Sequence, residues 1–324
     1  MKTRLFRICM PVIAAVLLSA AAVSGCGDAK QVNKELAGRK TGLEYIDKGD
    51  YDNAILAFNK ALGERAGIVS NLEEDINFYK AFAQIEAGKT QDAIRTYTAL
   101  IEYDEKNADA YYLRGCAYIS TGKNKQAVSD FEQASKAKKD SGAMCAGIYE
   151  QLMSAGLSGE AASYLKQGLE LKGDDAASCL ARGKLYLLSG DYEKAETELG
   201  NALELKDQTA NLYLGRLFQA QDKGEEARSY YEAYLQDNPN DSKVLYELGQ
   251  IAFLQGNFEE AVSWFEQGLS CKNILNKRAL WTGRIAALEY AGNFPGALDE
   301  VNRYLEQYPN DAAAQKELLF LQSR

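Results

Sequence analysis

The stretch SGDYEKAETELGNAL, residues 189–203, decides the fold because related stretches recur along the chain. KGDYDNAILAFNKAL at 48–62, QGNFEEAVSWFEQGL at 255–269 and AGNFPGALDEVNRYL at 291–305 share its glycine and the alanine five residues later. Weaker copies begin at residues 87, 121, 155 and 221, the last with its glycine shifted. Eight such windows in 324 residues indicate an internal repeat.

The alanine sets the period of this repeat. It is found at Ala54, Ala93, Ala127, Ala161, Ala195, Ala227, Ala261 and Ala297, and four of the seven separations are 34 residues. A small residue precedes it by twelve positions in six repeats, at Gly42, Ala81, Gly115, Gly183, Gly215 and Gly249. A large apolar residue follows it by four positions in all eight, from Phe58 to Val301. Tyr149 and Ile285 depart from the pattern at the small position.

This pattern resembles the tetratricopeptide repeat over about residues 35–311. The resemblance implies an all-α fold, an α-solenoid of about eight helix–turn–helix repeats that forms a right-handed superhelix. The repeats are expected at about 35–68, 74–107, 108–141, 142–175, 176–207, 208–241, 242–275 and 278–311. Residues 312–324 are expected to form a C-terminal capping helix, in which Leu318, Leu319 and Leu321 cover the last repeat.

The physical chemistry of the repeat agrees with the resemblance. Glycine is favoured in the turn because the residue that closes the first helix needs a positive φ. The polar residue after it can cap the second helix, as expected for Asp50, Asp191, Asn257 and Asn293. No unit can bury its apolar face alone, so the units are expected to stack.

AQIEAGKT, residues 83–90, fits the loose pattern of a phosphate-binding loop. Such a loop needs a buried strand before it and glycine freedom within it. Here the preceding residues read as helix, and Gly88 aligns with the turn glycines of the other repeats. We therefore expect a structural turn at Gly88 and no bound nucleotide.

The first 25 residues are expected to be a lipoprotein signal peptide. MKTRLFR is positively charged, and an apolar run follows it up to VSGC, residues 23–26. VSGC resembles the bacterial lipobox, which implies lipid attachment at Cys26 and a short tether over residues 26–34. An uncleaved membrane anchor is the alternative, although the run is short for a spanning helix. The protein is thus expected to be exported and lipid-anchored at the extracytoplasmic face of a bacterial membrane.

Composition argues against several function classes. The chain has no histidine, which removes the usual general base and the commonest metal ligand. Its net charge of −9 disfavours nucleic acid. We expect no enzymatic activity, no cofactor and no metal. Cys116, Cys145, Cys179 and Cys271 are expected to be unpaired core residues, because neighbouring helices are too far apart for a disulfide. Two disulfides or a metal site are the alternative.

In the resembled family the first helix of each repeat lines a concave groove that binds a peptide or a partner's helix. The front of that groove is expected to present Phe78, Phe82 and Tyr112, with acids at Asp75, Glu86 and Asp109, and then Glu150 and Met153. The rear is expected to present Leu180, Lys184, Leu187, Leu212, Arg216, Lys243, Tyr246 and Phe253, and no acid. Packing between helices is the alternative for several of the aromatic residues.

Together these features predict a membrane-anchored scaffold or adaptor of the bacterial cell envelope, which binds other envelope proteins or peptides. A solute- or glycan-capturing envelope lipoprotein is the alternative. A glycan binder should show clustered exposed tryptophans, and the chain has only Trp264 and Trp281.

Overall fold

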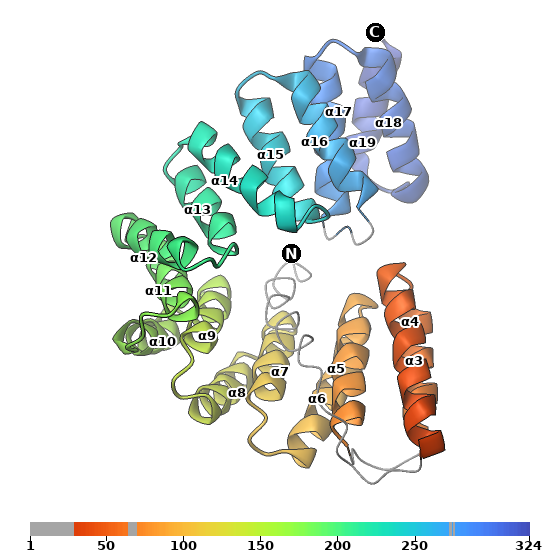
Figure 1. Cartoon of the computed structure of the whole chain (residues 1–324). Coiled ribbons are helices and arrows are strands. Elements are labelled where there is room, and N and C mark those ends of the chain that lie inside the picture. Colours follow the sequence, from red (N-terminus) through yellow and green to blue (C-terminus); the bar gives the residue numbers. More distant parts are fainter. Residues whose placement is uncertain (1–28, 64–69, 272–273, 275) are drawn as a thin grey trace. The chain divides into compact units, whose positions relative to one another are not determined.

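The computed structural model describes residues 29–63, 70–271, 274 and 276–324. Within those ranges every regular element is an α-helix, so the prediction of an all-α solenoid is confirmed (Figure 1). The helices belong to two compact units, Met1–Leu205 and Lys206–Arg324. The predicted signal peptide and Cys26 lie outside the described residues.

In each repeat an odd-numbered first helix is followed by an even-numbered second helix. The first unit contains α3 (Ala29–Asp47), α4 (Tyr51–Leu62), α5 (Asn71–Glu86), α6 (Thr90–Tyr103), α7 (Ala108–Ser120), α8 (Asn124–Ala137), α9 (Gly142–Ser154), α10 (Ser158–Glu170), α11 (Ala176–Ser189) and α12 (Tyr192–Glu204). The second contains α13 (Ala210–Ala220), α14 (Gly224–Asp237), α15 (Ser242–Leu254), α16 (Phe258–Ser270), α17 (Lys277–Tyr290), α18 (Phe294–Gln307) and α19 (Ala312–Gln322). Because α3 begins at Ala29, part of the predicted tether is helical.

Turns with a left-handed residue separate the two helices of each repeat. Seven of the turn glycines, including Gly88 and Gly190, have φ between 70° and 83°. The phosphate-loop-like segment is therefore a repeat turn: Thr90 begins α6, and Lys89 Nζ lies 2.6 Å from Asp52 Oδ1. In the sixth repeat Asp222 takes this conformation at φ 58°, while the shifted Gly224 is the first residue of α14.

Three of the four expected caps are present. The side chains of Asp50, Asp191 and Asn293 each accept a hydrogen bond from the backbone of the second helix that follows. The prediction for Asn257 is wrong, because its side chain makes no capping hydrogen bond to α16.

The small residue and the large residue of the repeat pack against each other. A β-carbon built on Gly115 would lie 2.6 Å from the Phe131 ring, and one on Gly249 would lie 2.5 Å from Phe265. Gly42, Gly183 and Gly215 approach Phe58, Leu199 and Tyr231 in the same way. The glycines thus allow close approach of the two helices within a repeat, and the facing aromatic rings are completely buried in the core.

Three repeats add a partly buried ion pair between their two helices. Arg114 makes two hydrogen bonds of 2.8 Å to Asp130, and Arg182 makes bonds of 2.9 and 2.8 Å to Glu198. Arg284 Nη1 lies 3.2 Å from Glu300 in the eighth repeat. Each arginine comes directly before the small residue of its repeat, or before Ile285, which replaces that residue in the eighth repeat. The three ion pairs therefore occupy the same place in their repeats. Two parallel bonds to one carboxylate also orient the helices.

The four cysteines in the described part of the chain are free and buried, as predicted. Burial raises the pKa of the Cys145 thiol to about 11. A buried thiol of this kind behaves as a small apolar residue with low reactivity.

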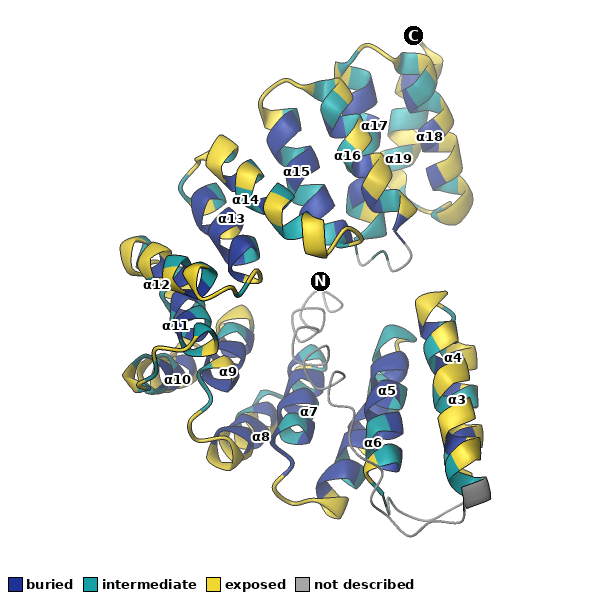
Figure 2. Cartoon of the chain, in the orientation of Figure 1, coloured by how far each residue is buried: buried dark blue, intermediate teal, exposed yellow. Residues whose placement is uncertain are grey.

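The last helix, α19, packs on α18 through part of the predicted leucine set. Leu321 is buried, and Leu318 packs against the cluster that contains Trp281 and Tyr304. Leu319 is 68% exposed, so its predicted capping role is wrong: it lies on the other face of α19. The alternation of buried and exposed residues around the helices is visible in Figure 2.

Candidate partner-binding surfaces

The aromatic residues predicted for the front of the groove belong to the core of the first unit. Phe78, Phe82 and Tyr112 are all buried, at 7% exposure or less. Phe82 packs edge-on against Tyr51 at 6.2 Å, and Tyr112 lies 5.8 Å from Phe131. For these three residues the alternative of packing between helices is what the structure shows.

The acidic residues predicted for the same region are paired with basic residues of neighbouring helices. Asp75 Oδ2 lies 2.5 Å from Arg39 Nε, and Asp109 accepts two hydrogen bonds of 2.8 and 2.9 Å from Lys138. Each cation lies about one repeat away in sequence. The expectation of an acidic front is therefore wrong for these two carboxylates, because tertiary pairing neutralises them.

The remaining predicted residues of the first unit are more accessible. Met153 is exposed on α9, and Glu86 and Glu150 are half-buried. On α11, Leu180, Lys184 and Leu187 are also half-buried. These residues lie on first helices, as the resemblance implies.

In the second unit, Arg216 is the accessible cation of α13. Its guanidinium carbon lies 5.3 Å from the centre of the Tyr213 ring, a cation–π geometry. Arg216 is exposed and makes no ion pair with any residue in the described ranges. The adjacent Leu212, one helical turn earlier, is half-buried. An arginine that stacks on a ring and is exposed to solvent can bind a carboxylate of another molecule.

The neighbouring helix α15 contributes Lys243 and Tyr246, both half-buried, but also an acid that the prediction omitted. Glu247 Oε2 accepts a hydrogen bond of 2.8 Å from Gln219 Nε2 on α13. The Oε1 atom of Gln219 in turn accepts a bond of 2.6 Å from the buried hydroxyl of Tyr231, whose pKa burial raises. The expectation that the rear repeats hold no acid is thus wrong, since Glu247 bridges α15 to α13.

Phe253 of α15 belongs to a different surface, at the turn end of its repeat. It contacts Phe258 and Tyr290, at ring-centroid distances of 5.4 and 5.2 Å. Neither partner was among the predicted site residues. Tyr290 has a signal in the sequence, because four of the first five repeats have a polar residue two positions before the turn glycine. Phe258 has no such signal, because Tyr51, Tyr192 and Phe294 occupy the same position in other repeats.

A shallow hollow lies on the second helices of the first unit, between α8 and α10. It has a volume of about 420 Å³, and Ser135, Tyr164 and Gln167 are among its lining residues. Ser135 already donates a hydrogen bond of 3.2 Å to Gln167, and the hollow is wide open to solvent. It therefore offers little enclosure to a small solute, which normally binds in a deep cleft.

Among the residues that the structure describes, no group of three or more Cys, Asp or Glu side chains is arranged to hold a metal ion. None of the helices in the described ranges combines the length and the apolar character needed to cross a membrane.

Comparison with known proteins identifies the family. Family models described as tetratricopeptide repeat match residues 80–143, 151–211 and 212–273, and a further one matches residues 42–66. These matches cover more than half of the chain, so the protein belongs to the tetratricopeptide repeat family. Proteins with this fold are typically non-catalytic scaffolds for binding other proteins.

Individual relatives are more distant. A chicken (Gallus gallus) protein, DnaJ homolog subfamily C member 3, is 33% identical over 78 residues, which are 24% of this chain and 15% of that protein. A tetratricopeptide repeat protein from Parabacteroides merdae has a similar structure, with a TM-score of 0.53 and 17% identity over 79% of this chain and 99% of that one. A chain of the APC/C hetero-tetramer Cut9–Hcn1 is also similar, with a TM-score of 0.52 and 15% identity. The match covers 89% of this chain and 55% of that one. These structural likenesses concern the fold.

Proposed function

We propose that this protein is a scaffold of the bacterial cell envelope, exported and anchored in the membrane by a lipid on Cys26, which binds a segment of a partner envelope protein. The family supports the general role of protein binding. The N-terminal sequence supports the anchor, because a charged start and an apolar run lead directly into VSGC.

The exposure of Arg216 is the main support for the proposed binding site. The chain has a net charge of −9, so acids outnumber basic residues. Arg216 nevertheless lies exposed on a first helix, without an ion pair in the described part of the chain and next to the half-buried Leu212. We infer that the partner segment brings a carboxylate to Arg216 and an apolar side chain to Leu212. The carboxylate mainly sets orientation and association rate, and the apolar contact contributes affinity.

The alternative of a glycan-capturing lipoprotein has less support. Trp281 is buried and donates a hydrogen bond of 2.8 Å to Glu300, so it serves the core. Trp264 is only half-buried, but it stands alone as a platform for a sugar ring. The open hollow on α8 and α10 does not change this conclusion.

Photo-crosslinking in living cells tests the binding site. A photoreactive amino acid at Leu212 of the full-length protein should give a crosslinked partner, and Arg216→Glu should reduce that crosslink strongly. The same photoreactive residue at Ser229, which is exposed on α14, is the control and should not capture this partner. This surface would be ruled out if Leu212 and Ser229 crosslinked the partner equally. It would also be ruled out if Arg216→Glu left the Leu212 crosslink unchanged.

The lipid anchor needs a separate measurement. Metabolic labelling with a fatty-acid analogue should label the wild type and not a Cys26→Ala variant, which should accumulate as an unprocessed precursor. Persistent labelling of the variant would show that Cys26 is not the attachment site, whatever the crosslinking shows.

A further inference from the structure

In the second unit, a partly exposed aromatic cluster lies at the turns that join α15 to α16 and α17 to α18. Phe253 of α15, Phe258 of α16 and Tyr290 of α17 form a triangle with centroid distances of 5.4, 5.2 and 5.3 Å. Leu254 follows Phe253 and is 82% exposed, and Tyr290 is 67% exposed. We call these four residues the aromatic turn patch. In Figure 2 the turn ends of α15 and α17 accordingly include exposed segments.

The repeat architecture does not require this exposure. Leu254 and Tyr290 each lie two residues before a turn glycine, Gly256 or Gly292. The equivalent residues of the first five repeats are Asp47, Glu86, Ser120, Ser154 and Leu188. Since polar residues suffice in four of those turns, folding does not explain a leucine and a tyrosine here. Exposed apolar side chains that gather at one end of a unit are typical of interaction surfaces.

The sequence on either side of the patch is acidic. Residues 244–271 and 285–302 contain no Lys or Arg, and their acids are Glu247, Glu259, Glu260, Glu266, Glu289, Asp299 and Glu300. Arg228 pairs with Glu260, Arg284 pairs with Glu266 and Glu300, and Arg303 also pairs with Glu300. Glu259, beside Phe258, has no such partner among the described residues.

The other acid next to the patch is Glu289, the neighbour of Tyr290. Glu317 of α19 lies close enough to raise the pKa of Glu289, so two acids lie together at this edge. No Lys or Arg in the described ranges lies over the rings of Phe253, Phe258 or Tyr290. Elsewhere in the chain such stacking is common, as for Arg278 over Tyr308 at 5.0 Å.

We propose that the aromatic turn patch binds a basic, amphipathic segment of a partner protein. An apolar side chain of that segment contacts Leu254, and an arginine or lysine stacks on the rings of Phe258 and Tyr290. The face of an aromatic ring attracts a cation, and the carboxylate of Glu259 and the negative charge shared by Glu289 and Glu317 strengthen that attraction. This surface is chemically opposite to the one at Arg216 and does not depend on it.

Two other occupants fit less well. A second copy of this chain would bring a net charge of −9 against a negative rim. The headgroups of anionic lipids would likewise be repelled by Glu259 and by the negative charge that Glu289 and Glu317 share. A basic protein segment satisfies both the apolar side chains and the charge.

The test uses the full-length protein and two synthetic probes. One is a 16-residue helical peptide with leucines on one face and arginines on the other, and the second has glutamate in place of every arginine. Fluorescence anisotropy measures their binding to wild type, to a Leu254→Ser/Tyr290→Ser variant, and to Leu188→Ser. The last is a matched control, because Leu188 occupies the same turn position and is only 38% exposed.

We expect the arginine peptide to bind wild type at least about tenfold more tightly than the glutamate peptide. The double variant should weaken this binding by about tenfold, the size of effect typical of removing anchor side chains. Leu188→Ser should leave the affinity within about twofold, since surface substitutions away from a site have small effects. Arg216→Glu should not weaken it either, which separates this surface from the other one. Circular dichroism confirms that each variant is folded.

Three results would overturn the proposal. The first is an unchanged affinity of the double variant for the arginine peptide. The second is a wild-type dimer, seen by light scattering, that the double variant converts to monomer, because the occupant would then be a second copy. The third is binding to vesicles of phosphatidylcholine and phosphatidylglycerol that the double variant loses, because the occupant would then be lipid.

Discussion

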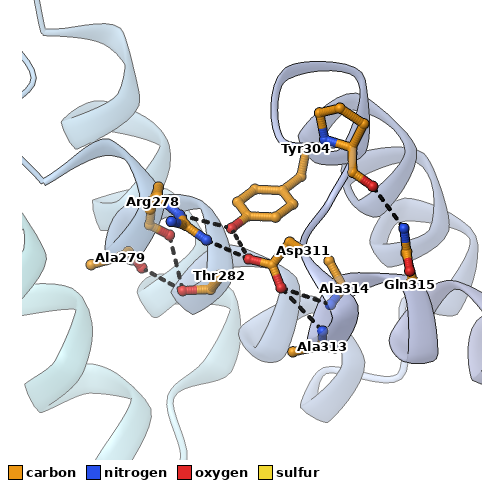
Figure 3. Close-up of polar contacts among 9 residues, drawn as sticks. Arg278, Ala279, Thr282, Tyr304, Asp311, Ala313, Ala314 and Gln315 are labelled. Atoms are coloured by element: carbon orange, nitrogen blue, oxygen red, sulfur yellow. Dashed lines mark hydrogen bonds and ion pairs between the residues drawn. The ribbon is translucent and has the colours of Figure 1, made fainter.

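The hydroxyl group of Tyr304 donates a hydrogen bond of 2.7 Å to Oδ2 of Asp311, seven residues later in the chain (Figure 3). Arg278 Nη2 lies 2.5 Å from the same oxygen, and Oδ1 accepts hydrogen bonds from the backbone of Ala313 and Ala314. One carboxylate therefore joins α17, the end of α18 and the start of α19. Hydrogen bonds from Tyr304, Ala314 and Arg278 lower the pKa of Asp311 to about 2.

Loss of the Tyr304 hydroxyl group should weaken this junction. Tyr304→Phe removes a buried hydroxyl donor and should destabilise the docking of α19 by about 1 kcal/mol. Hydrogen exchange followed by mass spectrometry should show faster exchange in peptides of α19 and unchanged exchange in α15. Equal protection of α19 in variant and wild type would show that the bond contributes nothing.

The same junction should depend on pH. The pKa of Asp311 is lower in the folded protein than its ordinary value of 3.8, so its stabilising effect is present above about pH 4 and is lost as the pH falls toward 2. Urea unfolding at several pH values should show Asp311→Asn less stable than wild type at pH 6, with the difference shrinking toward pH 2. A constant difference would contradict the assignment.

Glu289 should give the opposite pH dependence. Burial and the adjacent Glu317 raise its pKa from 4.5 to about 7, so the folded protein keeps a proton that the unfolded chain has lost. This contribution to stability therefore falls as the pH rises from about 4.5 to 7. Glu289→Gln should raise the melting temperature of the second unit by about 1–3 °C at pH 8 and have little effect at pH 4. Glu259→Gln, which removes an exposed carboxylate nearby, is the control for net charge.

Gly249 tests the packing within a repeat. A methyl group there would lie 2.5 Å from Phe265, so Gly249→Ala should destabilise the second unit by about 1–3 kcal/mol. Gly200→Ala is the matched control: its added methyl group meets nothing within 4 Å, and the change should stabilise α12 by about 0.5–1 kcal/mol. Adding Phe265→Leu to Gly249→Ala should recover part of the loss, since Ile285 faces a smaller Val301 in the eighth repeat. Chemical denaturation measures all three.

Asp222 marks a turn that glycine would suit better. It has a φ of 58°, which costs an ordinary residue about 1 kcal/mol. Asp222→Gly should therefore stabilise the second unit by a few tenths to about 1 kcal/mol, because relief of strain exceeds the added chain entropy. Asp222→Ala should give no such gain, because alanine keeps the β-carbon. A destabilising glycine would mean that the Asp222 side chain has a role of its own.

The repeat could be predicted in detail from the sequence because its rules are local. The turn glycines, the pairing of Gly115 with Phe131 and the cap at Asp191 each depend on residues that lie close together in the chain. Backbone conformation and close helix approach restrict the choice of residue at such positions so strongly that the pattern survives in one sequence. The family and the all-α fold follow from that pattern.

The candidate binding surfaces could be predicted only in part. The sequence placed Arg216 and Leu212 correctly on a first helix, where the structure finds them accessible. It could not show that Arg39 and Lys138 neutralise Asp75 and Asp109, because those partners come from other repeats.

Exposure is the property that only the tertiary structure decided. Phe78 and Tyr290 are both aromatic residues of first helices, yet one is buried in the core and the other is 67% exposed. Helical periodicity gives the direction of a side chain from its own helix, whereas exposure also depends on which neighbouring helices cover that direction. In a solenoid those neighbours come from the preceding and following repeats, so a side chain's accessibility is determined by stacking and not by its own repeat.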